Sequence, residues 1–188
     1  DIWSRVSPRC PNLKVEILPI SDHADLAGLF SELGVRYDLI EGVYGSEACR
    51  GLGRFMELQR TPICCAVSRE HRLYGATKLT MEDLGGEHLI MPIEGISKEL
   101  DEFRREIKEQ YPDIQIVDSP YYGLDTFALC EVNPYVLITQ QVYADIHTNL
   151  RTIPLETAHT MPYGLMYSHM PSAATRTFLE AVENVGMG

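Results

Sequence analysis

Residues 63–67 form an uninterrupted apolar run, Ile-Cys-Cys-Ala-Val, which constrains the fold more than any other feature of the sequence. Successive side chains of a β-strand point to opposite faces, so a strand without any polar residue must be covered on both faces. Helices on the two sides of a parallel sheet provide such cover. No apolar run in the chain is longer, and five residues are far fewer than the roughly 20 that cross a bilayer. The run therefore predicts a buried strand in an α/β protein and no membrane span.

The sequence around this run alternates between strand and helix patterns. Apolar residues at positions 26, 29, 30 and 33 follow the spacing of one helical face. Segments 14–20 and 38–44 flank it as strands, which gives the strand, helix, strand order of a parallel sheet. Residues 49–60 have the character of a loop or short helix. The same criteria predict later strands at 89–91, 114–117, 135–139, 150–155 and 163–167, and helices around 100–107, at 124–132 and from residue 171 onward.

Charge and composition narrow the possible functions. The 188 residues include 16 Lys and Arg against 27 Asp and Glu, a net charge of −11, in a chain long enough for one domain or two small lobes. Such an excess of acid disfavours direct binding of a nucleic-acid backbone, which needs clustered basic residues. The five cysteines include no C-x-x-C pair, which favours reduced thiols and a cytoplasmic location. The chain starts without Met and without a signal-peptide pattern, so we expect a fragment of a longer protein.

No motif for catalysis, metal binding or a cofactor stands out. The sequence has no G-x-S-x-G, G-x-x-x-x-G-K-[ST] or H-E-x-x-H motif. Its six histidines are scattered, with none three or four residues from another, as a helical metal pair would require. Cys64 and Cys65 lie inside the apolar run and are expected to be inert core residues. We therefore expect no enzyme activity, no metal site and no cofactor.

Polar residues at the carboxyl ends of the predicted strands are better candidates, because open parallel sheets bind ligands in the crevice beyond those ends. Ser97 has two interpretations: neighbouring N–H groups could hold an anion there, or the serine could simply cap a helix. The tyrosines and serines would suit a small acid or an aromatic compound, whereas Glu94 could favour a cation or a hydroxylated ligand. The candidate binding residues are Tyr44, Ser46, Glu94, Ser97, Tyr121, Tyr122, Thr139 and Gln140.

The order of several short motifs resembles the effector-binding domain of LysR-type transcriptional regulators. Each motif is weak alone, but together they span nearly the whole chain. Two departures occur: Arg72 replaces the family's usual proline, and residues 133–140 replace its glycine-rich loop. The matching segments are Pro11-Asn12 before a strand, residues 34–39 ending in Asp-Leu, residues 62–73 with a His-Arg-Leu turn, residues 79–84 with an L-t-x-x-D-L pattern, residues 163–167, and the closing helix at 171–182.

The resemblance implies a two-lobed α/β fold of the periplasmic-binding-protein-like type 2, with mixed, mostly parallel sheets flanked by helices. Two crossover strands, near residues 61–67 and 151–155, would join the lobes. Lobe I would comprise residues 1–61 and 152–188, and lobe II residues 62–151. A small-molecule effector would bind between the lobes and control a DNA-binding domain that this chain lacks. A solute-binding protein of a transporter is the alternative, disfavoured by the odd cysteine count and the missing signal. An enzyme such as prephenate dehydratase comes third, because residues 175–178 match that enzyme's motif imperfectly.

The resemblance also implies partners. We expect a homodimer or tetramer, in which strand 14–20 and the first helix of one subunit contact helix 124–132 of another. Operator DNA would bind only through the absent N-terminal winged helix-turn-helix, and no membrane partner is expected. The family's first strand is also missing, and it would lie between strands 14–20 and 38–44. We therefore expect either a gap or another segment at that place, and direct pairing of the two strands would contradict the fold.

Overall fold

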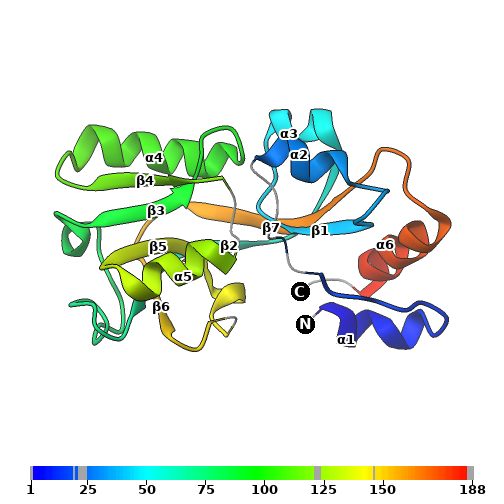
Figure 1. Ribbon diagram of the computed structural model, residues 1–188, viewed down its shortest axis with the longest axis horizontal. Helices are drawn as coiled ribbons and strands as arrows, with labels where there is room; N and C mark the ends of the chain where they lie inside the picture. Colours follow the sequence, from blue (N-terminus) through cyan, green and yellow to red (C-terminus); the bar gives the residue numbers. More distant parts are fainter. Residues whose placement is uncertain (1, 19, 21–24, 121–123, 146, 186–188) are drawn as a thin grey trace.

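Two lobes lie side by side in the computed structural model, which describes residues 2–18, 20, 25–120, 124–145 and 147–185 (Figure 1). Two strands connect them, β2 (Arg54–Ser68) and β7 (Thr160–Tyr167). The expectation of a second crossover at residues 151–155 is wrong, because residues 150–154 pair with β2 inside lobe II. Lobe I contains α1 (Ile2–Val6), η1 (Ser7–Arg9), α2 (Leu26–Ser31), β1 (Leu39–Gly42), α3 (Glu47–Leu52) and α6 (Ala173–Val185). Lobe II contains η2 (Glu82–Leu84), β3 (His88–Pro92), α4 (Lys98–Gln110), β4 (Gln115–Ser119), α5 (Leu124–Val132), β5 (Tyr135–Gln140), η3 (Gln141–Tyr143) and β6 (Leu150–Pro154).

Strand β2 belongs to both lobes. Its first part pairs with β7, ending with Pro62 opposite Thr160. From Ile63, which lies opposite Gln140, it pairs with β5, and from Cys64 it also pairs with β6. The sheet order is β1-β7-β2-β5-β3-β4, with β6 beside β2. One continuous sheet thus runs through the molecule, and the partner of β2 changes between Pro62 and Ile63.

The sheet is mixed, but the expectation that it is mostly parallel is wrong. Strand β3 pairs in parallel with β4 and with β5. The other four pairs, which are β1 with β7 and β2 with β5, β6 and β7, are antiparallel. The reason is topological, because the chain enters lobe II along β2 and returns along β7, so these two strands must run in opposite directions.

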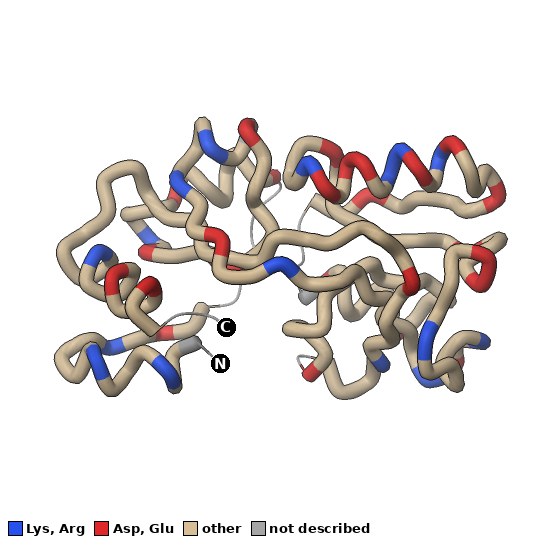
Figure 2. The backbone as a smooth tube through the Cα atoms, turned by 180° about the vertical axis from the view of Figure 1, so that it is seen from behind, with Lys and Arg blue, Asp and Glu red and all other residues tan. Residues whose placement is uncertain are grey.

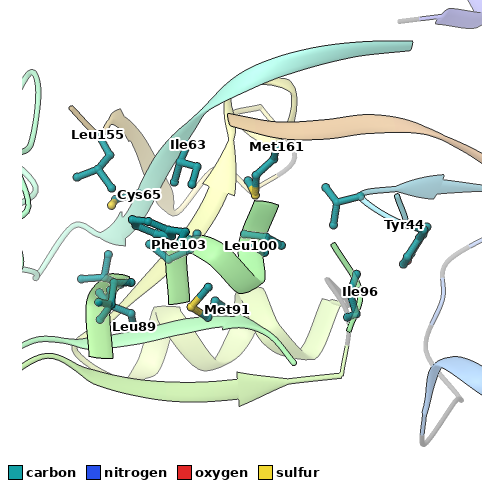
Figure 3. Packing of buried hydrophobic residues seen from close by; sticks show 14 of the residues in the cluster. Tyr44, Ile63, Cys65, Leu89, Met91, Ile96, Leu100, Phe103, Leu155 and Met161 are labelled. Carbon is teal, nitrogen blue, oxygen red and sulfur yellow. The ribbon is translucent and has the colours of Figure 1, made fainter. Parts of the chain in front are cut away.

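Both faces of the apolar run are covered, as the sequence predicts. Ile63 is fully buried in the same core cluster as Phe103 of α4 (Figure 3). Ala66 lies in a second cluster with Phe127 and Cys130 of α5. Burial of each large apolar side chain contributes about 1.5–3 kcal/mol, so α4 and α5 hold β2 in lobe II from opposite sides.

Residues 14–20 do not form the predicted strand. Residues 14–18 and 20 are irregular, and Ile17 is 89% exposed; position 19 lies outside the described residues. A strand needs backbone partners, and within the described part of the chain β1 pairs with β7 alone. The described residues therefore place no strand on the other edge of β1, and the direct pairing that would contradict the fold does not occur.

Residues 49–60 contain a strand where the sequence predicts a loop or short helix. The expected short helix is α3, but residues 54–60 form the first part of β2 instead of a loop. Strand β7 supplies their backbone partners, with an irregularity between Glu57 and Gln59. Local sequence does not reveal this strand because its partner is about 100 residues away.

Hydrogen bonds of the Arg72 side chain connect the turn that contains it to the rest of lobe II. Arg72 donates from Nε to Glu87 at 2.5 Å and from Nη2 to the Asp83 carbonyl oxygen at 2.7 Å. Glu87 also lies 3.2 Å from Nε2 of the buried His71. These contacts connect the turn to the segment before β3, so hydrogen bonds restrain it here.

Candidate functional site

The two lobes meet at the loops that follow β1 and β3, residues 43–46 and 93–97, which we call the seam. Ser46 donates its hydroxyl proton to the Gly95 carbonyl oxygen, and its backbone N–H donates to the Ile96 carbonyl oxygen at 3.2 Å. The same hydroxyl oxygen accepts from the Cys49 N–H at 3.1 Å and so caps α3. The Cys49 thiol lies 3.7 Å from the Ile96 oxygen, and burial raises its pKa. The predicted residue Ser46 thus joins the lobes directly.

Ser97 is fully buried and caps α4, which confirms the capping interpretation. Its Oγ accepts a hydrogen bond from the Leu100 N–H at 3.5 Å and donates one to Oε2 of Glu99 at 2.9 Å. Both interactions lie within lobe II. The hydroxyl therefore orders the end of the seam loop.

Arg60 forms a second link between the lobes. Its guanidinium lies 2.8 Å from Glu57 on the lobe I part of β2 and 2.7 Å from Glu99 on α4 of lobe II. Burial of Glu99 would raise the pKa of this carboxyl, but hydrogen bonds from Arg60, the backbone and Ser97 outweigh it and lower the pKa. The Glu99 hydrogen bond in turn raises the pKa of Arg60. The pair is charged at neutral pH and spans the junction.

Two further candidates, Thr139 and Gln140, lie at the carboxyl end of β5, where it meets β2 and β7. We call this place the crossover: residues 61–64 of β2, 139–140 of β5 and 160–162 of β7. Both side chains are buried. Gln140 donates from Nε2 to the carbonyl oxygens of Met161 and Pro162, at 3.1 and 3.4 Å. Three oxygens at the crossover are buried without a hydrogen-bond partner: Oε1 of Gln140, Oγ1 of Thr139 and Oγ1 of Thr61.

The remaining candidates lie at the margin of the seam or outside the described residues. The ring of Tyr44 is buried in the core and packs edge-on against Phe30, with centroids 4.9 Å apart. Glu94 lies on the surface 2.9 Å from Lys108, and this hydrogen bond lowers the carboxyl pKa. Tyr121 and Tyr122 lie outside the described residues.

Sequence reasoning missed residues on β1 and β7 near the crossover. Tyr163 donates its phenolic proton to Glu41, and burial, reinforced by this carboxylate, raises the tyrosine pKa. Its ring also meets Tyr143 of lobe II edge-on at 6.0 Å. Pairing of β1 with β7 brings Glu41 beside Tyr163, and Tyr143 contacts Tyr163 from η3, so no local motif marks these residues.

The described residues contain no group of three or more His, Cys, Asp and Glu side chains arranged to hold a metal ion. Within the same residues, no helix is both long and apolar enough to cross a membrane. A surface hollow of about 180 Å³ lies between β2 and α6, lined by Met56, Glu57, Leu58, Val182 and Glu183. It is away from the seam and below the roughly 300 Å³ of the smallest usual ligand pockets.

No protein-family model and no curated protein matches the sequence. Several solved structures match the fold. CbnR, a LysR family transcriptional regulator, is 14% identical with a TM-score of 0.69, over 98% of this chain and 64% of its own. The effector binding domain of QuiR in complex with shikimate is 20% identical with a TM-score of 0.60, over 87% of this chain and 78% of its own. A putative L-cystine ABC transporter from Listeria monocytogenes is 14% identical with a TM-score of 0.56, over 98% and 78%.

These similarities concern the fold. The expected two-lobed type 2 architecture is confirmed, and it is shared by LysR effector-binding domains and by solute-binding proteins. The chain spans less than two thirds of the length of CbnR.

Proposed function

We propose that this chain is the effector-binding domain of a LysR-type transcriptional regulator and senses a small molecule between its lobes. The observation that carries the proposal is the pair of lobes meeting at Ser46 and Gly95, with the unpartnered buried oxygen of Gln140 at the crossover beside them. A buried polar atom without a partner costs about 1–3 kcal/mol, and a bound ligand can supply that partner. The effector-binding architecture of CbnR and QuiR supports the same proposal.

The proposed site centres on Ser46, Thr139 and Gln140. The proposal also includes Tyr121 and Tyr122, which lie outside the described residues. Tyr44, Glu94 and Ser97 are proposed as its margin, because each already has structural partners. The boundaries expected from the sequence are residues 1–61 and 152–188 for lobe I and 62–151 for lobe II. Because β6 pairs with the lobe II part of β2 as far as Pro154, we propose that the second boundary lies after β6. The change of β2 partners between Pro62 and Ile63 supports the first boundary.

The proposal includes no catalysis, because the polar groups of the seam serve as helix caps and links between the lobes. It includes a cytoplasmic location, which the five free, buried cysteines favour. Operator DNA would be bound by a separate winged helix-turn-helix domain of the longer protein.

The proposal also includes a homodimer or tetramer. Apolar side chains are exposed on the two segments predicted to meet: Val15 and Ile17 in one, Leu129 and Val132 in the other. Helix α5 buries Phe127 in its own lobe, so the exposed remainder of its surface is smaller than the sequence led us to expect.

A solute-binding protein is the second candidate, since the fold of the Listeria transporter protein is similar. The coding sequence upstream of Asp1 separates the two: a helix-turn-helix supports the regulator, and a secretory signal supports the solute-binding protein.

Ligand sensing itself is tested by a thermal-shift screen of metabolites on the purified chain. A ligand at 100 times its dissociation constant adds about 2.7 kcal/mol of stability. Hydrogen exchange of the complex should then show protection at residues 45–46 and 139–140. Protection confined to other segments would contradict the proposed site, and a screen without any stabilising compound would contradict ligand sensing.

A further inference from the structure

The unpartnered oxygens at the crossover indicate what kind of ligand the site would bind. Gln140 is fully buried, and its amide is oriented by two hydrogen bonds from Nε2, to the carbonyls of Met161 and Pro162. This orientation leaves Oε1 without a partner. An amide oxygen only accepts hydrogen bonds, so the missing partner must be a donor.

A second oxygen lies on the same face of the sheet. Gln140 is opposite Ile63, and Thr61 is two residues from Ile63 on β2, so the side chains of Thr61 and Gln140 are diagonal neighbours. Thr61 Oγ1 is also buried without a partner. A hydroxyl can donate or accept, so one hydroxylated ligand can satisfy both atoms.

The charges around this place do not favour an anion. Arg60 is held by Glu57 and Glu99. Arg104, whose guanidinium is buried beside the end of β3, lies 2.6 Å from Asp118. Both cations therefore already have a carboxylate counterion, although Arg104 Nε is itself buried without a hydrogen-bond partner. Glu41, near the crossover, would repel an anion, because its partner there is the neutral Tyr163.

On these grounds, and resting on the proposed function, we propose that the effector is an uncharged, polyhydroxylated small molecule whose hydroxyl groups hydrogen-bond to Gln140 Oε1 and Thr61 Oγ1. In the free chain these two oxygens lack hydrogen-bond partners, and the bound ligand supplies them. This class differs from the shikimate anion bound by QuiR, because it carries hydroxyl donors without a carboxylate.

The first arm of the test measures the free protein. Replacement of Thr61 by Val removes an unpartnered buried hydroxyl at nearly constant volume, and should raise the melting temperature by about 2–4 °C. The control is Thr126→Val on α5 of lobe II, because the Thr126 hydroxyl is buried and hydrogen-bonded to Ser119 Oγ at 2.9 Å. This control should lower the melting temperature. A fall for Thr61→Val like that of the control would overturn the claim that Thr61 is unsatisfied.

The second arm measures ligands in chemically matched pairs: methyl shikimate with shikimate, glucose with gluconate, and myo-inositol with glucuronate. We expect at least one uncharged member to stabilise the protein, with its carboxylate counterpart at least tenfold weaker by calorimetry. Gln140→Leu and Thr61→Val should each weaken that binding at least tenfold, whereas Thr126→Val should leave it unchanged.

The outcomes separate this inference from the function on which it rests. Stabilisation by carboxylates alone overturns the inference and leaves ligand sensing intact. Binding of an uncharged member that is insensitive to Gln140→Leu also overturns it. If no compound of any pair binds, the ligand class is rejected. The broader metabolite screen then tests the proposed function separately.

Discussion

Ser46 of lobe I donates its hydroxyl proton to the backbone carbonyl of Gly95 of lobe II, while the same oxygen caps α3. One side chain therefore terminates a helix and joins the lobes. Gly95 adopts φ +93°, a conformation that favours glycine, and this backbone turns its carbonyl group toward lobe I. The seam is thus built from local signals on both sides, a helix cap and a glycine turn.

Replacement of Ser46 by Ala should lower the free energy of unfolding by about 0.5–2 kcal/mol through loss of the cap. It should also increase the radius of gyration measured by small-angle X-ray scattering, because the hydroxyl link between the lobes is lost. Ser97→Ala is the control: it removes a cap within lobe II, so stability should fall while the radius stays constant. Equal radii for Ser46→Ala and the wild type would contradict a role of Ser46 in holding the lobes together.

The pair of Arg60 and Glu99 should make stability depend on acid pH. The Glu99 pKa is lowered in the folded state, so its contribution is present above the unfolded value of about 4.3 and is lost as the pH falls through the lower folded value. Arg60→Gln should cost at most about 1 kcal/mol at pH 7, because the pair is partly exposed. Near pH 3 the difference from the wild type should shrink.

Urea unfolding at both pH values measures this change. Lys98→Gln is the control, because Lys98 is 80% exposed in its side chain and lies 3.7 Å from Glu102, so its loss should change little at either pH. If Arg60→Gln lowers the free energy of unfolding equally at pH 7 and pH 3, its effect comes from packing and not from the ion pair.

The acidic chain should not bind duplex DNA by itself. Its net charge is −11, and Figure 2 shows basic residues interleaved with acidic ones along α4. Fluorescence anisotropy with labelled duplex DNA at low salt should give no saturable signal at micromolar protein. Micromolar binding that weakens steeply with added salt would reverse this conclusion.

Self-association should depend on the two exposed apolar segments. Ile17→Glu and Val132→Glu place a charge on side chains that are 89% and 80% exposed, so folding should be unaffected and dimerisation weakened. Met170→Glu is the matched control, since Met170 is 88% exposed in the segment before α6, outside the segments predicted to meet. Sedimentation equilibrium measures the dimerisation of each variant. A wild type that stays monomeric at high concentration would contradict the proposed dimer.

The five cysteine thiols should be unreactive in the folded protein. All are buried, and burial raises the pKa of Cys65 far above its ordinary value and that of Cys130 to about 12. A thiol reagent at pH 8 should therefore label none of them quickly, and should label all five in urea. Val132→Cys provides an exposed control that should react at once. Rapid native labelling of Cys64 or Cys65 would contradict their core position.

Local sequence was sufficient wherever periodicity and burial act on neighbouring residues. The 63–67 run predicts a strand covered on both faces, and the 124–132 segment predicts a helix with the bounds of α5. Ser46 and Ser97 lie before helices in the sequence, and the structure uses both as caps. Side-chain spacing and capping are properties of a few adjacent residues, so they can be deduced without knowing the fold.

Tertiary structure decided whatever depends on a distant partner. Residues 54–60 became a strand because β7 pairs with them, whereas residues 14–18, with a similar pattern, stayed irregular. Arg60 joins the lobes, and Gln140 reaches β7, only because β2 passes from one lobe into the other. The physical reason is that backbone and side-chain hydrogen bonds need their partners in place, and local sequence does not reveal which distant segment supplies them.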